Sequence, residues 1–141
     1  MLIVVPGTPD ADLSLNGRVH WAKRSRLTKQ LRGTARRAAE GVIGCGLVDP
    51  VFDGPVRVRS VIAWEPYRKT VDGDNASGLL KPIMDGFSDA NLWRDDRQCV
   101  FEPIEQQRDP DKRGYVAVLV MRGDAILAGD DGAPRDERGA R

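Results

Sequence analysis

The apolar residues of the chain follow two spacings, and each spacing predicts a different kind of element. Strands are predicted where apolar residues run together or alternate with polar ones, at residues 2–5, 56–64, 98–107 and 115–121. Residues 108–114 are rich in turn formers, so they are expected to join the last two strands as a hairpin loop.

Two segments show helical spacing instead. Over residues 23–43 the apolar residues recur every three or four positions, which predicts an amphipathic helix. A second helix is predicted over about residues 75–89, with Asp74 or Asn75 as its N-cap. Pro82 falls inside it, where proline removes a backbone hydrogen bond and its ring clashes with the preceding turn. Either the helix kinks there, or its regular part starts just before Pro82.

The order of these elements, β-α-β-α-β-β, predicts an α/β protein, an α+β layer arrangement with a small mixed sheet. A length of 141 residues suits one domain, placed at residues 1–122. Residues 123–141 are mostly glycine, alanine, aspartate and arginine, with little apolar content. That composition predicts a disordered C-terminal tail.

The composition indicates in which cellular compartment the protein is expected. The two cysteines, Cys45 and Cys99, lack a metal-ligand spacing, which favours reduced thiols over a disulfide framework. The first apolar run is too short for a signal peptide, and no apolar stretch is long enough to span a membrane. We therefore expect a cytoplasmic protein with no membrane partner.

Charge is segregated although the net charge is only +1. Residues 18–37 carry eight basic side chains and no acid, which is typical of a surface that binds a polyanion. His20 and Trp21 lie in the same segment and are candidates to stack on an unpaired base. The alternatives are a solvated helix face for the basic residues and a core position for Trp21.

Acidic residues gather in a later segment. Asp72, Asp74, Asp85, Asp95 and Asp96 lie within residues 72–96, which carry a net charge of −4. On one helix, Asp74, Lys81 and Asp85 share a face, because seven and eleven residues are close to two and three turns. Converging carboxylates favour a hard cation such as Mg²⁺, beside which a lysine can stabilise a phosphate. Turn and N-cap chemistry is the competing explanation of each aspartate.

Several of these segments together resemble the RusA family of Holliday-junction resolvases, small endodeoxyribonucleases common in phages and prophages. The resemblance covers about residues 2–121. It rests on the motifs Leu13-Ser-Leu-Asn16, His20-Trp21, Lys23-Arg24, Asp72-Gly-Asp74-Asn75, Lys81-Pro82, Asp85-Gly86 and Leu92-Trp93-x-Asp95-Asp96.

The resemblance implies a homodimer that binds four-way DNA junctions and resolves them by paired symmetric nicks with Mg²⁺, for which Mn²⁺ is a possible substitute, in recombination and repair. It implies that Asp72, Asp74 and Asp96 are catalytic metal ligands and that Lys81 is the catalytic lysine. Asp85 and Asp95 are second-tier metal candidates. The residues expected to contact DNA are Asn16, Arg18, Lys23, Arg24, Arg26 and Lys29.

Two other functions remain open at this point. One is a module that binds branched or single-stranded DNA without cutting it, which the basic segment supports equally well. The other is a metal-dependent nuclease acting on other branched DNA.

Overall fold

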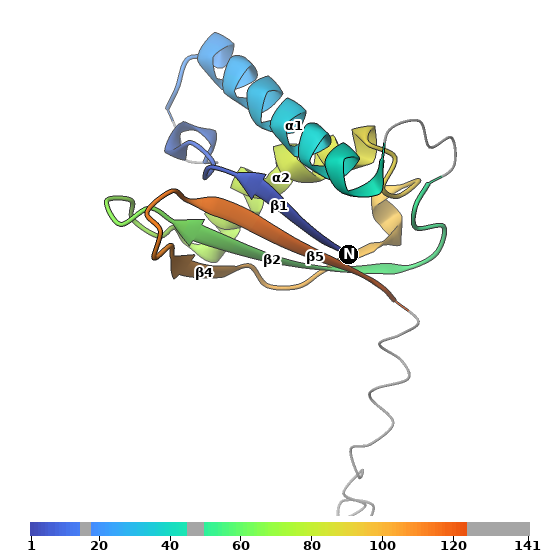
Figure 1. Cartoon of the computed structure of the whole chain (residues 1–141). Helices are drawn as coiled ribbons and strands as arrows, with labels where there is room; N and C mark the ends of the chain where they lie inside the picture. The colour runs from blue at the N-terminus through green and yellow to red at the C-terminus, as the bar shows by residue number, and fades with distance from the viewer. Residues whose placement is uncertain (15–17, 45–49, 124–141) are drawn as a thin grey trace, which may run out of the picture.

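A mixed sheet packed under two helices makes up the fold in the computed structural model, which describes residues 1–14, 18–44 and 50–123 (Figure 1). Within those residues the sheet has five strands. The elements in chain order are β1 (Leu2–Pro6), η1 (Ala11–Leu13), α1 (Trp21–Ile43), β2 (Val56–Trp64), α2 (Gly73–Asp89), η2 (Asp96–Gln98), β3 (Cys99–Phe101), β4 (Glu105–Arg108) and β5 (Tyr115–Arg122). The predicted α/β architecture with a mixed sheet is confirmed. The predicted tail beyond Gly123 lies outside the described residues.

The sheet is organised around β2. β5 pairs with β2 and β1 in antiparallel fashion, and β3 and β4 both pair with β2 in parallel on its other edge. The predicted hairpin between the last two strands is therefore wrong. The loop at residues 109–114 crosses the end of β2 instead, where the Asp109 amide donates to the Trp64 carbonyl across 2.9 Å.

The predicted strand at residues 98–107 is also wrong as a single element. Its first residue, Gln98, ends the 3-10 helix η2, and the remainder forms the separate strands β3 and β4. The Glu102 amide donates to the Val58 carbonyl across 2.9 Å before the break. Pro103 follows, and because it has no N–H it cannot continue the ladder.

Helix α2 runs through Pro82 without a break in the helical assignment. The alternative in which the regular helix starts just before Pro82 is therefore wrong. The N-cap is Asp72 rather than Asp74 or Asn75, so the helix starts two residues earlier than predicted. Eight of its residues are buried. We attribute the tolerance of Pro82 to this packing, which offsets a cost of about 3 kcal/mol.

The two helices approach closely at Gly86. A Cβ placed on Gly86 would lie 2.4 Å from the Arg32 carbonyl oxygen and 2.9 Å from the Ala35 Cβ. Only hydrogen fits between the helices at this point, which gives the Asp85-Gly86 motif a packing role. The contact holds α2, which carries Asp74 and Asp85, against the basic helix α1.

The helices cover one face of the sheet, and within the described part of the chain no helix packs on the other (Figure 1). The inward face carries Val56, Val58 and Ile62 of β2, all at most 1% exposed, beneath the helices. Figure 1 shows both α-helices on that side. On the opposite face Leu2 and Val4 of β1 are 56% and 49% exposed. Within the described part of the chain, no helix is both long and apolar enough to cross a membrane.

Candidate functional site

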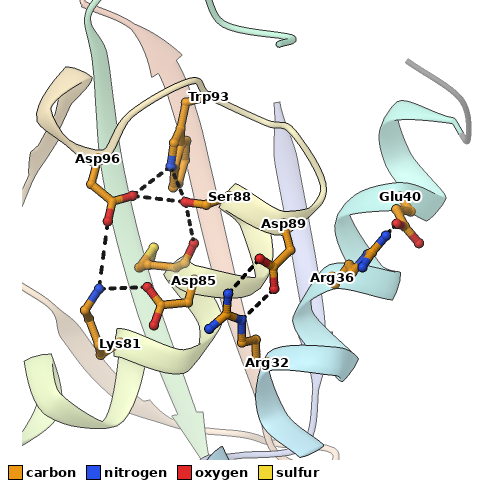
Figure 2. A network of polar contacts seen from close by, with 10 residues as sticks. Arg32, Arg36, Glu40, Lys81, Asp85, Ser88, Asp89, Trp93 and Asp96 are labelled. Carbon is orange, nitrogen blue, oxygen red and sulfur yellow. Dashed lines mark hydrogen bonds and ion pairs between the residues drawn. The ribbon is translucent and has the colours of Figure 1, made fainter. Parts of the chain in front are cut away.

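Lys81 lies where two carboxylates from different elements meet. Its Nζ is 2.7 Å from Asp85 Oδ1, one turn further along α2, and 3.8 Å from Asp96 Oδ2 at the start of η2 (Figure 2). The hydrogen bond to Asp85, together with the negative charge of both carboxylates, raises the pKa of Lys81 above its ordinary value against an opposing effect of partial burial. The group is therefore a cation at neutral pH, suited to stabilise an anion and not to act as a base.

Asp96 is held in place by neutral donors. Its Oδ1 accepts from the indole Nε1 of Trp93 at 3.1 Å and from the Ser88 hydroxyl at 3.0 Å (Figure 2). The same indole is 2.8 Å from Ser88 Oγ and is only 1% exposed, with its ring edge-on to Phe87. The carboxylate thus has one oxygen fixed by the core, while the other faces Lys81.

Asp95 has a different role from its neighbour. Its side chain accepts from the Arg97 amide at 2.9 Å, and Gln98 Oε1 accepts from the Asp95 amide at 2.9 Å, which completes a capping box on η2. Turn chemistry accounts for Asp95. Of the two adjacent aspartates, Asp96 is the one directed toward Lys81.

The first two aspartates stand at the N-terminus of α2. Asp72 is the N-cap, but its side chain makes no capping hydrogen bond, and Asp74 lies in the first turn. Both side chains are exposed, and neither has an ion-pair partner among the described residues. Capping therefore does not account for the Asp72 carboxylate. Both aspartates remain available to a cation.

The loop that leads to these aspartates is fixed by Gln106 of β4. Its Oε1 accepts from Trp64 Nε1 at 2.9 Å and from the Val71 amide at 3.0 Å, while its Nε2 donates to the Val71 carbonyl at 2.7 Å. Both backbone groups of Val71 are therefore satisfied by one side chain immediately before Asp72. This contact sets where α2 begins.

Asp74, Lys81 and Asp96 line one cavity of about 660 Å³ between α2 and the edge of the sheet. Its other walls are largely apolar. They come from α2, β2, the end of β3 and the segment between β3 and β4, and include Leu80, Met84, Phe101, Pro103 and Ile104. Asp72 is absent from this lining, although the adjoining Gly73 belongs to it.

The donor chemistry of the site fits a hard cation. Asp74 and Asp96 offer only carboxylate oxygen, which Mg²⁺ prefers, and both are exposed to solvent. Burial and then the charge of Asp95 and Asp96 raise the pKa of the Cys99 thiol to about 12, so the free thiol is protonated at neutral pH. No three acidic, histidine or cysteine side chains of the described residues are gathered as a metal cluster. Asp74 and Asp96 are the cavity residues that would hold Mg²⁺, and Asp72 stands two residues before Asp74 at the N-cap of α2.

The basic residues of α1 and the segment before it fall into two groups. Some are already engaged: Lys23 pairs with Asp12 at 2.7 Å, and Arg24 donates to the carbonyls of Leu13 and Ser14. Arg32 makes two hydrogen bonds to Asp89 that link α1 to α2 (Figure 2). Four exposed side chains have no ion-pair partner in the described part of the chain, namely Arg18, Arg26, Lys29 and Arg37, the last of which donates to the Thr34 hydroxyl. Asn16 lies outside the described residues.

Trp21 is not a core residue. It is the first residue of α1 and is 75% exposed, so the core interpretation is wrong. The preceding His20 caps the helix, since its Nδ1 accepts from the Ala22 amide at 3.2 Å. The two rings lie 5.6 Å apart. A large aromatic side chain is thus presented to solvent at the basic end of α1.

A chain of hollows connects this end of α1 to the carboxylates. The first is lined by Trp21, Lys29 and Arg32, and it shares Arg24 and Thr28 with the second. The second lies between the helices and shares Ser77 and Lys81 with the cavity that holds Asp74 and Asp96. A nucleic-acid strand laid along these hollows would pass from basic side chains to Lys81.

Comparison with known proteins places the chain in a family. No family model matches it. A protein of Xylella fastidiosa (strain Temecula1), described only as uncharacterized, is 41% identical to it over 127 residues. The matched region is 90% of this chain and 79% of that protein. The chain belongs to the same family as the Xylella protein. Because that description names no activity, the function of this chain has to be inferred from the residues of the site.

Sequence reasoning did not identify several residues that shape this site. Ser88 and Trp93 hold Asp96, Gln106 holds the approach to Asp72, and Phe101 with Ile104 forms a cavity wall. The sequence did offer a clue to Trp93, since it stands three residues before Asp96 in the motif Leu92-Trp93-x-Asp95-Asp96. Gln106 carried none, because its contacts join segments 35 residues apart.

Proposed function

We propose that the protein is a Mg²⁺-dependent endodeoxyribonuclease that resolves four-way DNA junctions in recombination and repair, as its resemblance to the RusA family implies. One observation carries most weight. Asp74, Asp96 and the cationic Lys81 line a single cavity that adjoins hollows on the basic helix α1. Carboxylates for a cation and basic groups for a polyanion are thus parts of one continuous surface.

Each residue of the site has a distinct task in this proposal. Asp74 and Asp96 hold the cation, with Asp72 at the adjoining helix start. Lys81 stabilises negative charge on the phosphate or the leaving oxygen, for which a residue that stays protonated is suited. Mg²⁺ held by these carboxylates would supply an activated water and offset phosphate charge. Trp93 and Ser88 keep the Asp96 carboxylate oriented before the cation arrives.

Unpaired basic side chains supply the sequence-independent part of DNA binding. Arg18, Arg26 and Lys29 are exposed and free to contact phosphates, whereas Lys23 and Arg24 are engaged within the protein. Trp21 offers a platform on which a base freed at a branch point can stack.

The protein acts as a homodimer in this proposal. A four-way junction presents two equivalent strands to be cut, and a two-fold dimer places one site at each. Leu2 and Val4 on the uncovered sheet face offer apolar surface to a second copy. Light scattering should give twice the chain mass of 15.5 kDa. A monomer that nicks both strands would contradict this part of the proposal.

The decisive experiment uses a synthetic four-way junction and two charge-removing variants, Asp74→Asn and Asp96→Asn. Each should abolish Mg²⁺-dependent nicking while junction binding persists, because asparagine keeps the shape but weakens cation binding. Asp111→Asn, which changes an exposed aspartate on the loop after β4, is the matched control and should nick normally. Unchanged nicking by both site variants would rule out the assigned ligands.

The alternative is a module that binds branched DNA without cutting it. It is favoured if the wild-type protein binds junctions but does not nick them with Mg²⁺ or Mn²⁺. A nuclease for other branched DNA is distinguished by substrate, since flaps or splayed arms would then be cut faster than four-way junctions.

A further inference from the structure

We infer that the apolar part of the cavity beside Asp74 and Asp96 receives an unpaired nucleobase of the strand being cut, with Phe101 as its stacking surface. This inference rests on the proposed function and deepens it. It assigns to the cavity the recognition of the nucleotide next to the scissile phosphate. Trp21 lines a different hollow and has no part in it.

The cavity exists because α2 does not cover the edge of the sheet. Phe101 is in register with Val58 of β2, so both side chains lie on the face that carries the helices. Val58 is buried, whereas Phe101 is 49% exposed. Nothing in the described part of the chain closes over the Phe101 ring. A half-exposed aromatic side chain is left beside the carboxylates.

Size and lining both suit a nucleobase. The volume of about 660 Å³ lies within the range of about 300–1,000 Å³ that is usual for ligand sites. Leu80 and Met84 form an apolar wall on α2, and Ile104 belongs to the segment that carries Phe101. Ser60 of β2 also lines the cavity and is 3% exposed. Its hydroxyl can offer a hydrogen bond to the polar edge of a base.

Polar groups at the same cavity argue for a nucleotide over a purely apolar ligand. Asp74, Lys81 and Asp96 line the cavity together with the apolar side chains. A nucleotide matches this division, because its base is flat and aromatic while its phosphate needs a cation or an ammonium group. A base stacked inside a duplex cannot enter. The site therefore favours nucleotides that are unpaired or easily unstacked, as at a branch point.

The test compares Phe101→Ala with Val100→Ala. Val100 is the preceding residue of β3 and is 65% exposed, so its side chain projects to the other face and serves as the matched control. Phe101→Trp keeps an aromatic surface and is the rescue variant. The substrates are four-way junctions with either a normal nucleotide or an abasic site next to the mapped nick.

For wild type, removal of the base should slow Mg²⁺-dependent nicking by about tenfold, the scale of one lost base–aromatic stack. Phe101→Ala should show the same loss on the normal junction and no further loss on the abasic one. Val100→Ala should behave as wild type, and Phe101→Trp should recover most of the rate. Equal sensitivity of wild type and Phe101→Ala to base removal would overturn the inference.

A binding measurement separates this inference from the proposed function. Junctions with 2-aminopurine at successive positions near the branch are titrated with protein in Ca²⁺. One position should brighten as its base leaves the stack, and Phe101→Ala should abolish that change. If wild type never nicks DNA, the proposed function fails, while a signal that depends on Phe101 still supports the base pocket. If no position responds to Phe101, the pocket inference fails even for an active nuclease.

Discussion

The buried indole of Trp93 donates to Asp96 Oδ1 across 3.1 Å, which joins the hydrophobic core directly to the candidate site. Trp93 is 1% exposed, while Asp96 is on the surface. The indole N–H of Trp93 also donates to the Ser88 hydroxyl oxygen, so one donor contacts two oxygens. The position of the carboxylate is therefore set by core packing and not by the exposed turn that carries it.

Trp93→Phe tests this link. Phenylalanine retains most of the apolar volume and the contact with Phe87, but it removes the N–H. We expect the Mg²⁺ concentration for half-maximal nicking to rise about tenfold or more, as is usual when a residue that orients a metal ligand is lost. Phe87→Leu, which alters the packing around the same indole and leaves the hydrogen bond, is the control. A similar Mg²⁺ dependence in the two variants would show that the hydrogen bond to Asp96 has no positioning role.

Lys81 is predicted to act as a permanent cation. Lys81→Met should lower the nicking rate by about 100-fold or more, because a charge that stabilises the transition state is removed. Lys81→Arg should retain part of the rate. Since the lysine side chain is 64% exposed, thermal unfolding should change little in either variant.

The pH profile provides a separate check on Lys81. Its pKa is raised above 10.5 by Asp85 and Asp96, so the side chain is mostly protonated from neutral pH up to that value. The rate of nicking should not fall between neutral pH and about 10 through loss of this proton. A Lys81-dependent fall near neutral pH would indicate a depressed pKa and a different role.

Local sequence patterns predicted the elements well where the spacing of apolar residues stayed regular along the whole element, as in α1 and β2. They failed where distant contacts decide the outcome. The sequence predicts a kink at Pro82 or a regular helix that starts only there, yet α2 runs through Pro82 with eight of its residues buried. The strand around Pro103 was read as continuous, because its alternation does not reveal where a proline must leave the ladder.

In the candidate site, too, local periodicity predicted some features, while contacts between distant residues decided others. Helix periodicity correctly placed Asp74, Lys81 and Asp85 along one side of α2, where they line two adjoining cavities. Periodicity did not distinguish Asp95 from Asp96, because the difference depends on a capping box and on an indole buried elsewhere in the fold.

Gly86→Ala should destabilise the protein even though alanine is the better helix former. The added methyl group would lie 2.4 Å from the Arg32 carbonyl oxygen, so the helices must separate, at a cost of about 1–3 kcal/mol. Gly41→Ala is the matched control, because Gly41 lies in α1 with no atom within 4 Å of the added Cβ. It should stabilise by up to about 1 kcal/mol. Denaturant unfolding measures both, and a neutral Gly86→Ala would refute the close approach.

Asp109 should make the fold sensitive to acid. Burial alone would raise its pKa, but the amides of Asp111, Gly114 and Arg113 donate to its carboxylate and hold the pKa below the ordinary 3.8. A depressed pKa stabilises the fold above 3.8, and this contribution is lost as the pH falls through the folded-state pKa. Asp109→Asn should lower stability at neutral pH and show a smaller further loss toward low pH. Thermal unfolding as a function of pH measures the difference, and parallel curves for the two proteins would contradict it.

Binding at the basic helix should depend on which arginines and lysines are unpaired, not on net charge alone. Changing Arg26 and Lys29 together to alanine removes two exposed cations that have no ion-pair partner among the described residues. If each contacts a phosphate, the slope of log affinity against log salt should fall by about two. Lys23→Ala with Arg36→Ala removes the same charge from the same helix, but Lys23 is paired with Asp12 and Arg36 with Glu40. That control should leave the slope nearly unchanged. Equal slopes for the two double variants would mean that DNA responds only to the overall charge of α1, and the proposed path from Trp21 to Lys81 would have to be abandoned.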